Sequence, residues 1–417
     1  GLPVFPPVQP EEFAFALPEV PSIVVLPFDV LGPEKDDDSY LADGLSENVT
    51  ANLAKLPGLL VIARNSAFVY KDRAVDVRQI ARDLGVQYIL EGSLSRSGES
   101  LRITAQLNDA VAGNHILAET YDVALEDYFA VLDRITLAIL SQIYQGTVTG
   151  PKIKPVQTQN LKAFIEVVRG WDAIQPFTPD ALLEARQRFE AAAGLDAGYA
   201  RALAGIGFTH LMAVRLGYAE DGPEALAVAQ TYLDRARRLD PQDGMVEGDR
   251  AILALLRGEG EEARRLAMRA NSLNPGDSSV SLRVAWVLRN LGHSEQSVLY
   301  HQKAKRMKVH RGWDEIMDEL VAQIDAGNYE AAADLTETFL GAAPEMWRAA
   351  FMAYPAMVQW QLGNEAAARD WIARAKRGWP EISIAALGAF DIPYLDRSLP
   401  ERRYAVWRKL GLPEHPP

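Results

Sequence analysis

The chain has 417 residues, a length that corresponds to two or three domains. Hydrophobic residues make up 48% of it, which is enough to bury real cores. Lys and Arg number 43 against 56 Asp and Glu, and the net charge of −13 disfavours nucleic acid and anionic membrane surfaces as partners. The lack of cysteine excludes disulfides, thiolate metal sites and thiol nucleophiles. No stretch reaches the roughly 18 apolar residues that span a bilayer, so we expect no direct membrane insertion by this chain.

The first residues are rich in proline, with Pro3, Pro6, Pro7 and Pro10 among the first ten. They show neither the basic region nor the apolar region of a signal peptide. We predict that residues 1–19 form an extended linker with little ability to fold alone.

Residues 20–146 alternate between strand and helix patterns. The apolar run 23–28 predicts a buried strand, and the spacing of apolar residues over 40–56 predicts a helix capped by Ser39. A second strand is expected over 59–63, and a short helix over 77–84 is closed by Gly85.

Three further β-type runs, at 88–95, 101–107 and 116–123, are separated by turn residues and suit an antiparallel meander. A last amphipathic helix is expected over 125–144. The order β-α-β-α-β-β-β-α predicts an α/β domain with a mixed sheet.

This part of the chain resembles a known family. The segments PSIVVLPF, YLADGLSENVTANLAKLPGLLVIARNSAFVYK and VRQIARDLGVQYILEGSLSRSGESLRITAQLNDA look like the TolB amino-terminal-like domain, and the resemblance covers residues 21–145. It implies a place in a bacterial class III adenylate cyclase protein or a CadC-like membrane regulator, between an N-terminal output domain and C-terminal tetratricopeptide (TPR) repeats. The acidic loop 32–39 is longer than that family pattern suggests.

The remainder of the chain repeats with a period near 34 residues. Helix-terminating segments end at positions 241, 275, 309, 344 and 380, and glycines recur between them. Two helices and two tight turns take about 34 residues, so the period predicts an all-α TPR-type solenoid of five to six units. The recurring glycines are Gly217, Gly258, Gly292, Gly327 and Gly363. Small residues expected at close helix crossings are Ala185, Ala229, Ala263, Ser297, Ala332 and Ala368.

The array departs from the usual repeat pattern, because the terminal proline is missing at Val309 and early aromatic residues are scarce. We assign a linker to residues 147–159, the repeats to 160–395, and a capping helix with a tail to 396–417.

Motifs for catalysis are missing from the sequence. There is no phosphate-binding G-x-x-x-x-G-K-[ST] loop, no G-x-S-x-G nucleophile turn and no H-E-x-x-H zinc motif. We therefore expect no enzyme activity, no cofactor and no metal site in this chain. The carboxylates at 36–38 lack the calcium-loop pattern and are interpreted as a solvated loop.

Two candidate sites follow from these patterns. Arg64, Asn65 and Ser66 come at a strand end, where α/β sheets bind ligands, although a turn whose Asn and Ser side chains bond the local backbone explains them better. The other candidate is the concave groove of the repeats, lined by residue types that are frequent at binding surfaces; the favoured alternative is that its tryptophans pack between helices as core. In the register we assign, the groove residues are Arg215, Trp286, Arg289, Asn290, Met357, Trp360 and Gln361.

The first functional hypothesis is a non-catalytic sensory region that binds a protein or peptide in the TPR groove. The alternative is a small-molecule sensor, with its ligand in the α/β domain or at the junction with the first repeat. The resemblance implies a periplasmic location behind one transmembrane helix, with the cytoplasm as the alternative. It also makes a homodimer possible, although no coiled-coil heptads enforce one.

Overall fold

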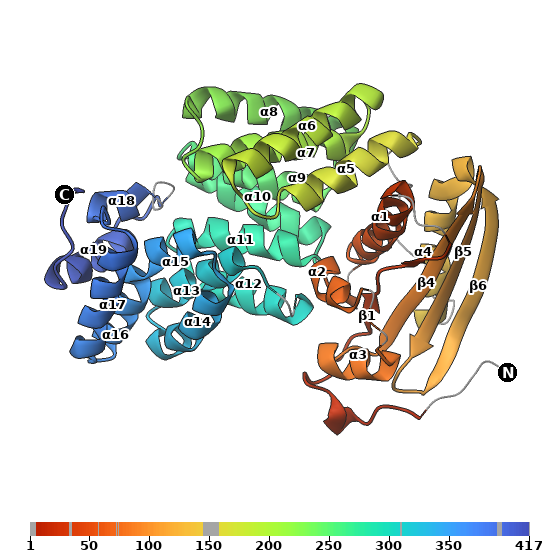
Figure 1. The fold of residues 1–417 in the computed structure, drawn as a ribbon, viewed down its shortest axis with the longest axis horizontal. Coiled ribbons are helices and arrows are strands. Elements are labelled where there is room, and N and C mark those ends of the chain that lie inside the picture. The colour runs from red at the N-terminus through yellow and green to blue at the C-terminus, as the bar shows by residue number, and fades with distance from the viewer. Residues whose placement is uncertain are drawn as a thin grey trace.

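The computed structural model describes residues 6–32, 36–56, 58–71, 73, 75–144, 158–308, 311–389 and 394–416. Within them, a mixed sheet with helices forms the N-terminal part and antiparallel helix pairs form the rest, which confirms the predicted fold class (Figure 1). Val309 and residues 147–157 of the expected linker lie outside the described residues.

The sheet has the strand order β3-β1-β4-β5-β6, with the short β2 also beside β4. Strand β1 pairs in parallel with β3 and β4, whereas β4, β5 and β6 form an antiparallel meander. The strands are β1 (Ser22–Val25), β2 (Asp29–Val30), β3 (Leu60–Val61), β4 (Tyr88–Ser97), β5 (Ser100–Asp109) and β6 (Asn114–Ala124). The meander was expected, whereas β2 was not, because two residues carry no periodicity.

Helices α1 (Asp36–Leu53) and α4 (Tyr128–Ile143) share one buried cluster with the sheet, and α3 (Val77–Leu84) shares a second. Helix α1 begins at Asp36, so Ser39 lies inside it and is not its N-cap. The expected loop 36–38 is instead the first turn of the helix, where the helix dipole stabilises the carboxylates of Asp37 and Asp38. Short turns complete the domain: η1 (Pro10–Glu12), α2 (Arg64–Ala67), η2 (Phe68–Tyr70) and η3 (Leu125–Asp127).

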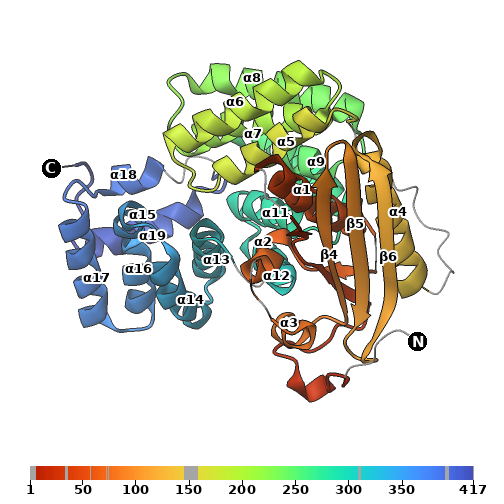
Figure 2. The same ribbon diagram turned by 45° about the vertical axis from the view of Figure 1, so that its right-hand side comes forward.

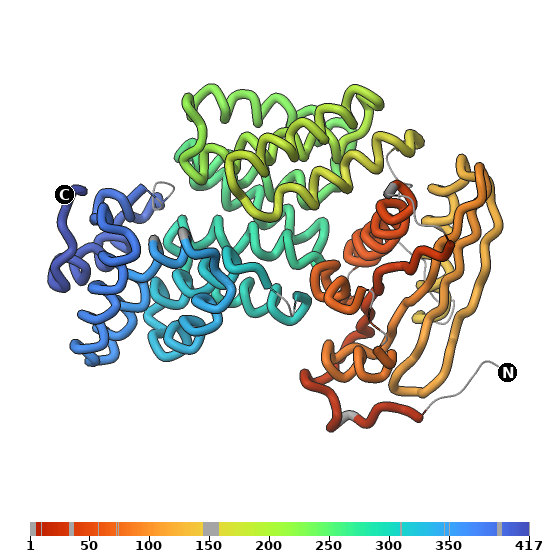
Figure 3. The backbone as a smooth tube through the Cα atoms, in the orientation of Figure 1, coloured from red at the N-terminus to blue at the C-terminus, as the bar shows by residue number. Residues whose placement is uncertain are grey.

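The described part of the N-terminal segment packs on the α/β domain (Figure 3). Val8 is 1% exposed, and its backbone N–H donates to the Ala110 carbonyl at 2.8 Å. Phe13 is also buried, and the N–H of Ala14 donates to the Arg82 carbonyl at 2.8 Å. Two apolar side chains thus anchor a stretch whose prolines suggested only an extended linker.

The solenoid consists of successive helix pairs. In chain order these are α5 (Leu161–Ala173) with α6 (Pro179–Leu195), α7 (Ala200–Arg215) with α8 (Gly222–Leu239), α9 (Gly244–Leu256) with α10 (Gly260–Leu273), α11 (Ser278–Asn290) with α12 (Ser294–Met307), α13 (Trp313–Ala326) with α14 (Tyr329–Ala342), and α15 (Glu345–Phe351) and α16 (Ala353–Gln361) with α17 (Glu365–Gly378). The short α18 (Ile384–Gly388) and α19 (Ser398–Lys409) follow.

The repeat signals have a direct structural meaning. All six small residues expected at helix crossings are 0% exposed, because a larger side chain would separate the paired helices. All five expected inter-helix glycines have φ between 73° and 88°, a conformation that other residues rarely adopt. Helix α19 covers the last pair, where the fully buried Trp407 donates from Nε1 to the Ala353 carbonyl at 2.7 Å.

The α/β domain is docked against the solenoid along several helices (Figure 2). At one end, Phe164 of α5 enters the core of the α/β domain. Further along, the N–H of Gly276 donates to the Ala54 carbonyl at 3.1 Å, and the N–H of Ala63 donates to the Met307 carbonyl at 2.7 Å. No helix of the described residues is long and apolar enough to cross a membrane.

Candidate functional site: a cavity between the two domains

A cavity of about 400 Å³ lies where the α/β domain faces the first helices of the repeat pairs. Its α/β wall comes from α1 and the start of α2, and includes Glu47 and Arg64. Its solenoid wall comes from α5, α7, α9, α11 and α13, and includes Phe208, Arg283 and Trp286. Ligand pockets commonly have volumes of about 300–1,000 Å³ and often form at domain interfaces. The cavity, called the interdomain cavity below, therefore has the size and position of a ligand site.

The two candidate sites of the sequence analysis partly meet in this cavity. Arg64 and Asn65 line it from α2, whereas Arg215 and Trp286 line it from α7 and α11. Ser66 is 0% exposed and does not line it.

Arg64 connects the domains electrostatically. Its Nη1 donates to the Asp172 carboxylate of α5 at 3.1 Å, its Nε lies 3.8 Å from Glu47, and its guanidinium stacks 4.1 Å from the ring centre of Phe68. Burial lowers the pKa of Arg64, but the carboxylates of Glu47 and Asp172 outweigh it and raise the pKa overall. On the other side, Arg201 lies 3.8 Å from the same Glu47.

Arg215 is held differently. Its guanidinium lies 4.7 Å from the ring centre of Trp286, and it makes no hydrogen bond or ion pair with any described residue. Desolvation lowers the pKa of Arg215, although Asp318 and Asp314 act in the opposite direction. Its cation is therefore held by an aromatic face and faces the cavity without a counter-ion in contact.

Beyond Arg215 the interdomain cavity adjoins a smaller space of about 110 Å³, called the apolar chamber below. Its wall includes Trp286, Trp313, Trp347, Phe351 and Tyr354. Both spaces share one set of lining residues, called the neck below. The neck consists of Phe177, Met212, Arg215, Trp286, Trp313, Asp314 and Asp318.

The remaining groove candidates occupy other environments. Arg289 lines only the apolar chamber; its Nη1 donates to the Tyr394 hydroxyl and its Nη2 donates to Asp318 Oδ1 at 2.7 Å, whereas its Nε is buried without a hydrogen-bond partner among the described residues. Asn290 is 0% exposed and donates to the Trp286 carbonyl at 2.7 Å.

Three further groove candidates lie on α16, outside both spaces. Met357 is buried, Trp360 is half-buried and Gln361 is exposed. Their role as partner contacts stays a prediction.

Several cavity residues escaped the sequence analysis. Arg283 lies 5.0 Å from the ring centre of Phe208 and donates to Asp249 at 2.6 Å. Burial raises the pKa of Asp249, and Arg283 counteracts this. Arg283 could have been found from helical spacing, because it lies nearly one turn before Trp286 on α11 and therefore near the same face of the helix.

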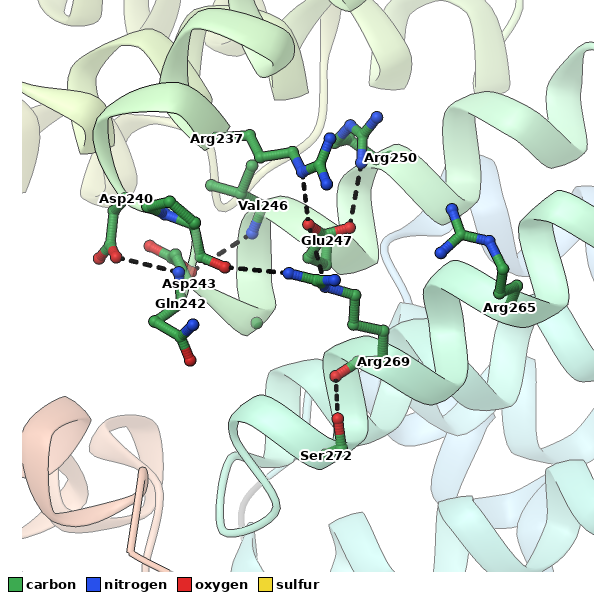
Figure 4. A network of polar contacts seen from close by, with 12 residues as sticks. Arg237, Asp240, Gln242, Asp243, Val246, Glu247, Arg250, Arg265, Arg269 and Ser272 are labelled. Carbon is green, nitrogen blue, oxygen red and sulfur yellow. Dashed lines mark hydrogen bonds and ion pairs between the residues drawn. The ribbon is translucent and has the colours of Figure 1, made fainter. Parts of the chain in front are cut away.

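A second charged cluster, in the solenoid, contains a buried carboxylate that is paired on both of its oxygens (Figure 4). Glu247 of α9 is 1% exposed and accepts from Arg237 at 3.0 Å and from Arg250 at 3.1 Å, with Arg269 at 3.4 Å. The cluster links α8, α9 and α10, and its buried carboxylate is fully matched. Among the described residues, no group of three His, Asp or Glu side chains is placed to hold a metal ion.

Fold and site together define a class of protein: an α/β domain docked on a TPR-type solenoid, with a cavity between them. The chain matches no family model. It is 38% identical over 224 residues to "Putative adenylate cyclase 3" of Rhizobium meliloti (strain 1021), a match that spans 52% of this chain and 38% of that relative.

Among solved structures, the chain is similar to Pseudomonas aeruginosa PilF, with a TM-score of 0.40, 15% identity, and coverage of 55% of this chain and 96% of that chain. It is also similar to a thermophilic TPR protein of Thermus thermophilus, with a TM-score of 0.33, 15% identity, and coverage of 48% of this chain and 96% of that chain. These likenesses are weak, and the solenoid is defined by the helix pairs of the chain itself.

Proposed function

We propose that this chain is the non-catalytic, ligand-sensing region of a bacterial signalling protein of the adenylate cyclase type. The observation that carries the proposal is the interdomain cavity, because its walls come from both domains. The relative named as a putative adenylate cyclase supports the cyclase context, and its remaining length leaves room for a separate output domain. We further propose that the α/β domain is a TolB amino-terminal-like domain, on the sequence segments quoted above.

The geometry suggests how sensing would work. A ligand in the cavity adds contacts between α1–α2 on one side and α7–α13 on the other, so it binds the docked arrangement better than a separated one. A ligand that prefers one state stabilises it by about 2.7 kcal/mol at one hundred times its dissociation constant. Binding would thus alter how firmly the α/β domain is held, and that change is the signal we propose.

A thermal-shift screen with a library of bacterial metabolites tests the proposal. Ala51 of α1 lines the cavity and is half-buried, so Ala51→Trp fills the ligand space. Ala227→Trp, on the exposed surface of α8, is the matched control. We expect at least one compound to raise the melting temperature of the wild type and of Ala227→Trp but not of Ala51→Trp. Compounds that stabilise all three proteins equally, or none of them, would contradict a site in the cavity.

A protein or peptide partner is the second candidate. The observation in its favour is that Trp360 and Gln361 lie outside the cavity on a surface that the α/β domain does not close. A partner on that surface would lose affinity for Trp360→Ala and keep it for Trp286→Ala, measured on immobilised protein. The reverse result would place the partner in the cavity.

Two further proposals concern the parent protein. We propose a periplasmic location, with the cytoplasm as the alternative, which topology reporter fusions to the full-length protein would test. Homodimer formation is testable by light scattering on the purified chain.

A further inference from the structure

The neck between the interdomain cavity and the apolar chamber combines opposite charges with an aromatic wall. Arg215 ends α7, and Asp314 lies in the first turn of α13. Both line both spaces. A ligand that reaches from the larger space into the smaller one must therefore pass these two side chains.

The apolar chamber is suited to one compact apolar group. Trp313 stacks on Trp347 with ring centres 5.3 Å apart, and Trp347 stacks on Phe351 at 5.8 Å. Met317 and Val321 contribute aliphatic surface to the same wall. An apolar protein cavity of about 150 Å³ is known to bind benzene, so the smaller chamber of about 110 Å³ suits a branched aliphatic group better than an aromatic ring.

Only one of the three charged side chains of the neck is held in an ion pair with an arginine or lysine of the described residues. Asp318 pairs with Arg289 at 2.7 Å, and Glu315, beside the neck, pairs with Lys308. Arg215 and Asp314 are different, because the salt bridges of the described residues include neither side chain, although each acts on the other electrostatically. Burial raises the pKa of Asp314, and the charges of Lys308 and Arg215 counteract this. The neck therefore presents one guanidinium and one carboxylate, neither of them held in a direct ion pair with a described side chain, to whatever occupies it.

We propose that the neck and the apolar chamber bind an α-amino acid with an apolar side chain, an inference that rests on the proposed function. The α-carboxylate would pair with Arg215, the α-ammonium would pair with Asp314, and the side chain would fill the apolar chamber. A purely anionic ligand would face the Asp314 carboxylate, and a purely cationic ligand would face Arg215. A zwitterion satisfies both groups, and buried charges that gain partners are the ones that contribute strongly to affinity.

Calorimetric titration with L-leucine and L-phenylalanine tests the proposal directly. N-acetyl-L-leucine lacks the ammonium, and L-leucinamide lacks the carboxylate. A hydrogen bond to a charged group corresponds to at least about tenfold in affinity, so each derivative should bind at least about tenfold more weakly than L-leucine. Derivatives that bind as well as the free amino acid would overturn the zwitterion assignment. They would indicate a peptide C-terminus if the N-acetyl form binds, or a peptide N-terminus if the amide binds.

Substitutions at Arg215 and Asp314 test which charged group of the ligand each residue binds. Arg215→Gln should weaken L-leucine at least about tenfold, and Arg215→Lys should recover part of that loss. Asp314→Asn should weaken L-leucine similarly, while leaving the affinity for N-acetyl-L-leucine nearly unchanged, since that compound has no ammonium to lose. The matched control is Arg374→Gln, because Arg374 lies 4.8 Å from the ring centre of Trp371 on α17, away from both spaces.

The outcome separates this inference from the proposed function. If no amino acid binds while another metabolite stabilises the wild type but not Ala51→Trp, the amino-acid inference fails and the sensing function stands. Equal affinities for L-leucine in Arg215→Gln, Asp314→Asn and the wild type would overturn the site itself. Each variant is first shown to keep the melting temperature of the unliganded wild type within a few degrees.

Discussion

Replacing Phe164 with alanine tests whether the α/β domain and the solenoid form one cooperative unit. Phe164 belongs to α5 of the first repeat, yet it is 1% exposed within the core of the α/β domain. Its ring meets Tyr128 and Phe129 edge-on, with ring centres 5.7 Å and 5.5 Å apart. It also lies directly on Gly44, where an added Cβ would come within 2.4 Å of the ring.

The expected cost follows from this packing. A Phe→Ala change in a core destabilises by about 3–5 kcal/mol, with larger values where the surroundings do not collapse into the space. Gly44 has no side chain to move inward, so we expect the upper half of that range. Urea unfolding followed by circular dichroism gives the loss of stability, and amide hydrogen exchange shows where it falls.

Phe189→Ala is the matched control. Phe189 is 0% exposed and packs in the same way on Gly170 and Gly205, but entirely within the solenoid. We expect Phe164→Ala to reduce exchange protection in α1 and α4, and Phe189→Ala to leave protection there unchanged. Unchanged protection of α1 in Phe164→Ala, or a loss of stability below about 1.5 kcal/mol, would show that the two domains do not share a core.

Two further predictions concern the backbone and pH. Gly85 and Gly98 both have φ of +61°, but a Cβ on Gly85 would lie 2.7 Å from the Phe15 carbonyl oxygen, whereas Gly98 faces open space. Gly98→Ala should cost about 1 kcal/mol and Gly85→Ala clearly more, as measured by urea unfolding. Burial, with Arg186 nearby, lowers the pKa of His210 to about 4. The unfolded chain therefore takes up a proton first, so stability is full above about pH 6.5 and falls towards pH 4. Urea unfolding measured at several pH values between about pH 6.5 and pH 4 should show a smaller loss of stability for His210→Gln than for the wild type. An equal loss in both proteins would show that His210 is not the group responsible.

Local signals in the sequence were sufficient for most of the fold. The helix at 77–84 was expected with its boundaries because Gly85 takes the left-handed conformation that ends it. The repeat glycines likewise mark turns, since each requires positive φ. The predicted start of α1 was too late, because the stabilisation of acidic residues such as Asp37 and Asp38 by the helix dipole is not visible in an apolar pattern.

The site was less accessible to prediction, because it depends on contacts between distant segments. Arg64 and Trp286 are each unusual within their own neighbourhood, but nothing in either segment indicates that they face one cavity. Their meeting depends on Phe164 entering the α/β core and on Arg306 of α12 donating to the Gly85 carbonyl at 2.7 Å. Asp314 was missed because a carboxylate in the first turn of a helix is usually explained by the helix itself.

The comparison of Arg215 with Arg289 shows why a residue type does not identify a binding group. Both were expected in the groove, and both line the apolar chamber. Arg289 is hydrogen-bonded to Tyr394 and paired with Asp318. Burial lowers the pKa of Arg289, but these two groups act against burial, and the pKa is raised overall. Arg215 has the face of Trp286 but no ion pair with a described side chain, and desolvation lowers its pKa although Asp318 and Asp314 act in the opposite direction. Removing Arg289 would therefore break a structural network, whereas a ligand anion at Arg215 would supply the partner that the fold leaves out.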